Sequence, residues 1–165
     1  MSRELEAVEA HVSAMHGMSG GAKASIEGMD YSNSNWDPSY DMRWFVANRA
    51  NLSSSKLDGV NLRFAELRGA DLSKSSLKGT LLDCAYMKGA NLSGADCTGA
   101  KFNGADLREV DFRGANLTDI FLGFAYLEGA MWDEDREAPS GWRLVDSKLQ
   151  REDPPKDPRF FRKGF

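Results

Sequence analysis

Few side chains in this chain are of the kinds that most often perform catalysis or bind metals. The two histidines, His11 and His16, lie five residues apart in a segment with helical apolar spacing, so they diverge around the helix. Cys84 and Cys97 have the spacing of neither a CxxC redox pair nor a zinc site. No glycine-rich phosphate loop precedes a helix, and no serine or cysteine has a base in register. The sequence therefore predicts a protein that is not an enzyme and has no metal or cofactor.

The dominant feature of the sequence is a period of five residues. From Leu52 to Trp132 every fifth residue is apolar without a break, and the residue two before it is nearly always small. Five matches neither the 3.6-residue period of a helix nor the two-residue period of a strand, so the chain must turn once per unit and stack on itself. The apolar centres are Leu52, Leu57, Leu62, Leu67, Leu72, Leu77, Leu82, Met87, Leu92, Cys97, Phe102, Leu107, Phe112, Leu117, Leu122, Leu127 and Trp132.

Individual units such as Ala65-Glu66-Leu67-Arg68-Gly69 and Ala90-Asn91-Leu92-Ser93-Gly94 have small, polar and leucine side chains in a fixed order. They resemble the A(D/N)Lxx units of the pentapeptide-repeat family. The resemblance implies an all-β solenoid, the family's right-handed quadrilateral β-helix with four units per coil. It places residues twenty apart above one another, about 4.8 Å apart along the axis.

The physical pattern agrees with such a coil. The centre and the small residue two before it are the only consistently apolar positions, so they must share one narrow interior. Glycine often follows the centre by two, as at Gly69 and Gly89, which suits a corner with positive φ. Cys97 replaces a central leucine, so we expect a buried, unreactive thiol there, while Cys84 lies at a corner.

The segments outside the regular run predict a cap at each end. An amphipathic helix is expected near the N-terminus, and a weaker repeat follows it, with one extra residue near Ser39. Trp142, Val145 and Leu149 suggest a short capping helix with Ser140 as its N-cap. The expected division is an N-terminal helix and linker, a degenerate first coil, the β-helix, an irregular C-terminal cap and a basic aromatic tail, over residues 1–23, 24–49, 50–134, 135–152 and 153–165.

Length, charge and composition are those of an ordinary water-soluble protein. The chain has 165 residues, a formal net charge of −4 and 41% hydrophobic residues. No apolar run is long enough to span a membrane, and the N-terminus lacks the apolar stretch of a signal peptide. We expect a cytoplasmic protein, or one in another reducing compartment, that does not bind nucleic acid directly.

Apolar side chains replace polar ones at one corner of the expected coil. They fall on two adjacent faces, and the polar residues Lys101, Gly104 and Asp106 divide them into two patches about 10 Å apart. Exposed apolar patches rarely stay uncovered, so this chain's own arms or another protein must cover them. The tail adds phenylalanines among basic residues. The predicted partner-binding residues are Phe64, Leu81, Tyr86, Phe121, Phe124, Tyr126, Arg159, Phe160, Phe161, Arg162 and Phe165, with Cys84 at the same corner.

Two functions fit these features. The first is a structural or adaptor protein whose rigid β-helix, aromatic corner and terminal arms bind protein partners in a larger assembly, with a homo-oligomer left open. The second is implied by the resemblance alone, since some pentapeptide-repeat proteins mimic duplex DNA and protect type II topoisomerases. Between Ala50 and Glu134 the chain has nine basic and twelve acidic side chains, a net charge of −3. This mixed surface is unlike the dense negative charge of DNA and favours the first function.

Overall fold

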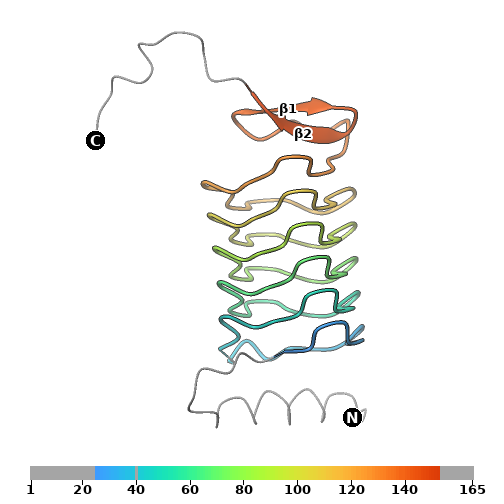
Figure 1. The fold of residues 1–165 in the computed structure, drawn as a ribbon, viewed down its shortest axis with the longest axis vertical. Coiled ribbons are helices and arrows are strands. Elements are labelled where there is room, and N and C mark those ends of the chain that lie inside the picture. Colours follow the sequence, from blue (N-terminus) through green and yellow to red (C-terminus); the bar gives the residue numbers. More distant parts are fainter. Residues whose placement is uncertain (1–24, 40, 153–165) are drawn as a thin grey trace, which may run out of the picture.

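The chain forms a stack of square coils that rise along one axis as a rod (Figure 1). The computed structural model describes residues 25–39 and 41–152. Successive coils are joined by parallel bridges between residues twenty apart, such as Asn51 to Asp71 and Asn91 to Asp111. The coil of four five-residue units that the resemblance to the pentapeptide-repeat family implies is therefore confirmed. In the part of the chain that is described, no helix is long and apolar enough to cross a membrane.

Each corner of a coil is a tight turn that follows directly from the repeat. In the unit around Leu67 the Ala70 amide donates to the Leu67 carbonyl at 3.1 Å, and Gly69 between them has a φ of 63°. Positive φ at the third residue defines a type II turn, and glycine adopts it at the lowest cost. The glycines that follow the centres are thus explained by the corners.

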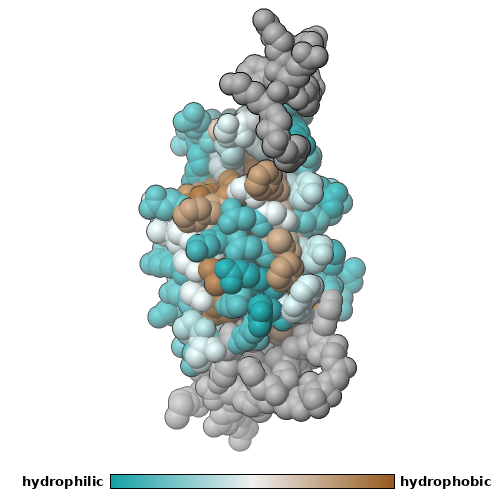
Figure 2. Space-filling view, turned by 90° about the vertical axis from the view of Figure 1, so that its left-hand side faces the viewer, coloured by the Kyte–Doolittle hydropathy of each residue, from teal (hydrophilic) through white to brown (hydrophobic). Residues whose placement is uncertain are grey.

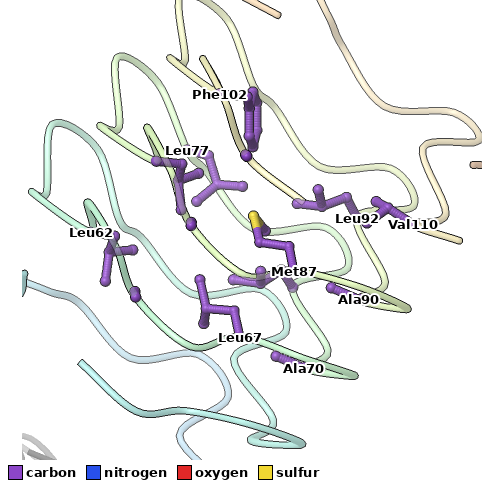
Figure 3. Packing of buried hydrophobic residues seen from close by; sticks show 14 of the residues in the cluster. Leu62, Leu67, Ala70, Leu77, Met87, Ala90, Leu92, Phe102 and Val110 are labelled. Carbon is purple, nitrogen blue, oxygen red and sulfur yellow. The ribbon is translucent and has the colours of Figure 1, made fainter. Parts of the chain in front are cut away.

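The interior is a continuous column of the apolar centres and their small neighbours. Leu67 and Met87 stack in successive coils, while Ala70 and Ala90 fill the narrow positions of the next face (Figure 3). All four are at most 1% exposed. In the described coils the interior is therefore filled by side chains.

The first coil contains the extra residue that the sequence predicts. Its bridges join residues 21 apart, as between Asn35 and Lys56, and the spacing returns to twenty at Asp41 and Asn61. Large side chains fill this irregular coil, with Trp36 packed edge-on against Phe45 at 5.7 Å between ring centroids. The expected N-terminal helix of residues 1–23 lies outside the described residues.

The cap at the C-terminal end is a β-hairpin, so the predicted capping helix is wrong. Strand β1, Trp142–Val145, pairs antiparallel with strand β2, Lys148–Arg151. Asp146 and Ser147 connect them with φ values of 48° and 58°, the pattern of a two-residue type I′ turn. Leu149 of β2 is fully buried against the last coil and exchanges backbone hydrogen bonds of 2.8 Å with Gly129 and Ala130. The hairpin therefore takes the place of a further coil.

The hairpin covers the last coil unevenly. Leu127 and Trp132 are 1% and 3% exposed. Leu117 and Leu122, which the repeat pattern places inside, are only half-buried. These two leucines depart from the sequence prediction because the described residues form no further coil above them.

Candidate functional site

One corner of the rod carries an unusual set of side chains at its turns. Trp44, Phe64, Cys84, Gly104 and Phe124 follow one another at intervals of twenty residues, and all have positive φ, between 58° and 67°. A left-handed backbone conformation costs a bulky residue roughly 1 to 2 kcal/mol. Among the described residues, the three aromatic side chains with positive φ all lie in this one column. We call these three residues, with Tyr86, Phe121 and Tyr126 on the flanking faces, the aromatic corner.

Most of the predicted apolar residues at this corner are exposed. Tyr86, Phe121 and Tyr126 are 41%, 51% and 56% exposed, and Phe124 is 98% exposed. Cys84 is also exposed, whereas Phe64 and Leu81 are half-buried. The structure therefore brings together the residues that the repeat pattern singled out between Phe64 and Tyr126.

Trp44 belongs to the same surface but was not among the predicted site residues. Its ring stacks on that of Phe64, with 4.4 Å between centroids and an interplanar angle of 10°. It is 49% exposed, so the stacked pair extends the corner by one coil. The signal in the sequence was its position two residues after the buried centre Met42 and twenty before Phe64.

The two patches are separated by a groove rather than by a flat surface. Figure 2 shows polar and apolar areas that alternate over one side of the rod. Because Gly104 has no side chain and Asp106 is short, the coil between Tyr86 and Tyr126 is recessed. The resulting groove holds about 350 Å³ and is lined by Cys84, Ala85, Tyr86, Gly104, Asp106, Arg108 and Tyr126. The separation that the sequence predicts is thus a real depression.

The floor of the groove carries a closed ion pair. Arg108 donates to both carboxylate oxygens of Asp106, at 2.7 Å each, which holds the pKa of that carboxyl below its usual range. The guanidinium of Arg68 lies over the Tyr86 ring, 4.8 Å from its centroid. Lys101 approaches the Phe121 ring in the same way at 5.9 Å. Basic groups therefore border the rings, while the acidic floor is already paired.

The basic side chains of Arg68, Lys88 and Arg108 follow one another at intervals of twenty residues beside this corner, and each has an acidic partner. Arg68 pairs with Glu66 at 3.4 Å, and Lys88 pairs with Glu109 at 3.2 Å. Exposed pairs of this kind contribute little stability. They leave this face with mixed charge and no strong field of either sign.

Carboxylates elsewhere on the rod are used to build its corners. The side chain of Asp71 accepts the backbone amide of Ser73 at 2.9 Å and the side-chain amide of Asn91 at 3.2 Å. The described residues contain no group of three or more histidine, cysteine or acidic side chains able to hold a metal ion. Burial raises the pKa of the Cys97 thiol to about 12, so it stays protonated at neutral pH. His11 and His16 lie outside the described residues.

The predicted site residues of the tail are not placed by the structure. Arg159, Phe160, Phe161, Arg162 and Phe165 lie outside the described residues. Their role in binding remains a prediction.

Known proteins resemble the repeat region. The profile of pentapeptide repeats matches residues 48–83 and 80–119, with eight copies. The pentapeptide-repeat protein Rfr23 from the cyanobacterium Cyanothece 51142 is 24% identical, with a TM-score of 0.57 over 66% of this chain and 91% of that one. No curated protein sequence matches.

Two other solved structures share the fold over about half of their own length. HetL, involved in heterocyst differentiation regulation in the cyanobacterium Nostoc sp. strain PCC 7120, is 27% identical, with a TM-score of 0.52 over 67% of this chain and 54% of that one. QnrB1, a plasmid-mediated fluoroquinolone resistance protein, is 15% identical, with a TM-score of 0.61 over 66% of this chain and 56% of that one.

The repeat profile and the twenty-residue coils lead to the same assignment. The neighbouring structures are pentapeptide-repeat proteins, and their fold is the right-handed quadrilateral β-helix. Residues 48–119 of this chain are therefore built of pentapeptide repeats.

Proposed function

We propose that this chain is a non-catalytic binding protein that docks a protein partner on its aromatic corner. The observation that carries the proposal is Phe124, which is 98% exposed and has a φ of 58°. Neither feature helps the chain to fold, because exposure of the ring loses burial energy and the left-handed conformation is strained. A costly side chain at a surface is a reason to look for a functional role.

The rest of the corner suits protein recognition. Tyrosine, tryptophan and arginine are enriched at protein interfaces. Here Arg68 lies over the Tyr86 ring, and Arg108 lines the groove with Tyr86 and Tyr126, while Trp44 stacks on Phe64. The rigid coils fix these side chains before a partner arrives, which lowers the entropy cost of binding. The groove between the tyrosines can accept a protruding side chain of the partner.

Mimicry of DNA is less well supported as a function. A DNA mimic needs rows of unpaired negative charge. Here Asp106 and Asp111 each bind an arginine, Arg108 and Arg113, at 2.7 Å. Asp83 and Asp96 also have basic partners, Arg63 and Lys78. The likeness to QnrB1 concerns the fold alone.

The test is affinity purification from the native cell extract with three forms of the chain. The intact chain is compared with the double variant Phe121→Ser/Tyr126→Ser and with Lys74→Ser, an exposed residue at the diagonally opposite corner. We expect a stoichiometric protein to bind the intact chain and Lys74→Ser but not the double variant, while thermal unfolding stays unchanged. Equal binding by all three forms would remove the aromatic corner from the interface. Capture of a type II topoisomerase would favour the second function.

A further inference from the structure

The last coil has an open half beside the hairpin. There the surface forms a groove of about 390 Å³, which we call the end groove. Apolar groups of the last coil form one wall and the hairpin forms the other. The lining residues are Leu122, Phe124, Ala125, Tyr126, Glu128, Ser140, Gly141, Trp142 and Arg151.

At and beside the end groove, the last coil also has backbone donors that find no backbone acceptor among the described residues. In the preceding coil the amides of Phe102, Gly104 and Leu107 donate to carbonyls of the last coil at 2.7 to 2.9 Å. The equivalent amides one coil later belong to Leu122, Phe124 and Leu127. Among the described residues, no backbone carbonyl accepts from these three. Leu127 is only 1% exposed, so water cannot readily reach its amide, and a buried donor without an acceptor costs free energy.

The described chain ends at the rim of this groove. Arg151 of β2 lines it, and the Glu152 amide donates to the Gly141 carbonyl at 2.9 Å. The remaining residues, 153–165, would reach roughly 45 Å if fully extended, at about 3.3–3.6 Å per residue. That length exceeds what is needed to cross the open half of one coil.

The composition of residues 153–165 matches the groove. Pro154, Pro155 and Pro158, and the residues before them, favour extended backbone. An extended segment offers carbonyls to the open amides. Proline has no backbone N–H, so the prolines would leave fewer donors on the outer edge for a further strand to pair with. Phe160 and Phe161 are suited to the apolar walls. Glu128 has a buried carboxylate oxygen without a hydrogen-bond partner among the described residues, and the tail is basic.

We propose that residues 153–165 occupy the end groove of their own chain as a final extended rung, whose carbonyls accept the amides of Leu122, Phe124 and Leu127. This inference goes beyond the proposed function, because it concerns the end of the β-helix rather than a partner, although Phe124 and Tyr126 belong to both surfaces.

Amide hydrogen exchange measured residue by residue tests the proposal. The full chain is compared with a chain that ends at Glu152. We expect the amides of Leu122, Phe124 and Leu127 to exchange at least about tenfold faster in the shorter chain. The amides of Leu82, Cys84 and Met87 occupy the same positions two coils earlier and are already paired, so they serve as internal controls and should not change. Equal exchange of the three end amides in both chains would refute the proposal.

Two further measurements identify the occupant. A peptide of residues 153–165 should restore protection in the shorter chain and leave the full chain unchanged, whereas the same peptide with Phe160→Ser and Phe161→Ser should restore less. Protection in the full chain that is lost on dilution, together with a dimer in sedimentation, would assign the groove to a second copy and overturn the proposal. If the controls show that the shorter chain has unfolded, the full-length Phe160→Ser/Phe161→Ser variant provides the comparison.

Discussion

Single residues in this protein differ mainly in whether they serve the coil or the surface. Phe102 and Phe124 illustrate the contrast, since the first is a fully buried centre and the second is 98% exposed at a corner. Phe102 contacts Phe112 edge-on at 6.2 Å and fills the column. Phe124 holds a strained turn without comparable packing. The same residue type thus stabilises the fold in one place and is available for binding in the other.

Replacement of Phe124 by glycine should separate these two roles. Phe124→Gly removes the strain of positive φ, so we expect the free energy of unfolding to stay within about 1 kcal/mol of the parent or to rise. Partner capture should be lost. Urea unfolding and the affinity purification described above measure the two effects. The matched change Phe102→Ala should cost about 3–5 kcal/mol. A large loss of stability in Phe124→Gly would show that its ring is packed in the native state.

The buried thiol predicts a pH dependence of stability. Burial raises the pKa of Cys97 to about 12, above the 9.0 of an ordinary thiol. Between these values the unfolded chain releases a proton that the folded chain retains, so rising pH favours unfolding by up to about 1.4 kcal/mol per pH unit. Below pH 9 the effect is absent. Urea unfolding at pH 8 and pH 10 should therefore show a steeper loss in the parent than in Cys97→Ala, and parallel losses would contradict the assignment.

At the scale of elements, the hairpin caps the rod through one deeply buried contact. Leu144 and Leu149 face each other across β1 and β2, but only Leu149 is fully buried against the last coil. We expect Leu149→Ala to cost about 2–5 kcal/mol and Leu144→Ala clearly less. Thermal unfolding of the two variants makes the comparison. Equal losses would mean that the hairpin is held by its own pairing rather than by the coil beneath it.

The sequence predicts the repeating elements well and the cap poorly. Each five-residue unit indicates its own corner and centre, so the turns, the buried column and the offset near Ser39 follow from the local pattern. The four units per coil, and with them the place of the exposed corner, are what the resemblance to the pentapeptide-repeat family implies. The cap has no repeat to support it. Trp142, Val145 and Leu149 suit a helical spacing, but the turn at Asp146 and Ser147 and the bridge from Lys148 to Met131 select a hairpin. Trp44 was missed because its coil is degenerate and has a weak frame.

At the scale of the whole molecule, the rod is a series of nearly equivalent quarter turns. Every unit contributes one centre and one corner, and each coil bonds only to its neighbours. The free energy of unfolding is then a sum over the units and the contacts between neighbouring coils, rather than the property of one central core. The length of the rod can therefore change in whole units without a change in its cross-section.

Deletions should preserve the fold only when they remove whole five-residue units. Removal of Tyr86–Ala90 keeps the frame of five, so we expect a folded β-helix whose later corners are rotated by a quarter turn. Removal of Tyr86–Lys88 breaks the frame and should destabilise the chain far more. Circular dichroism and thermal unfolding compare the two. The five-residue deletion also separates Phe124 from the Trp44 and Phe64 column, so binding that needs both patches should be lost. Similar stability of the two deletions would contradict the equivalence of units.

The bridges between coils also determine how the protein responds to force. Their hydrogen bonds run along the axis of the rod, so tension between its ends pulls each bond along its own length. The hydrogen bonds between two coils then break one after another, and each coil that opens adds twenty residues of extended chain. A rod built this way yields under load in small repeated steps and can limit the tension between whatever is attached to its two ends.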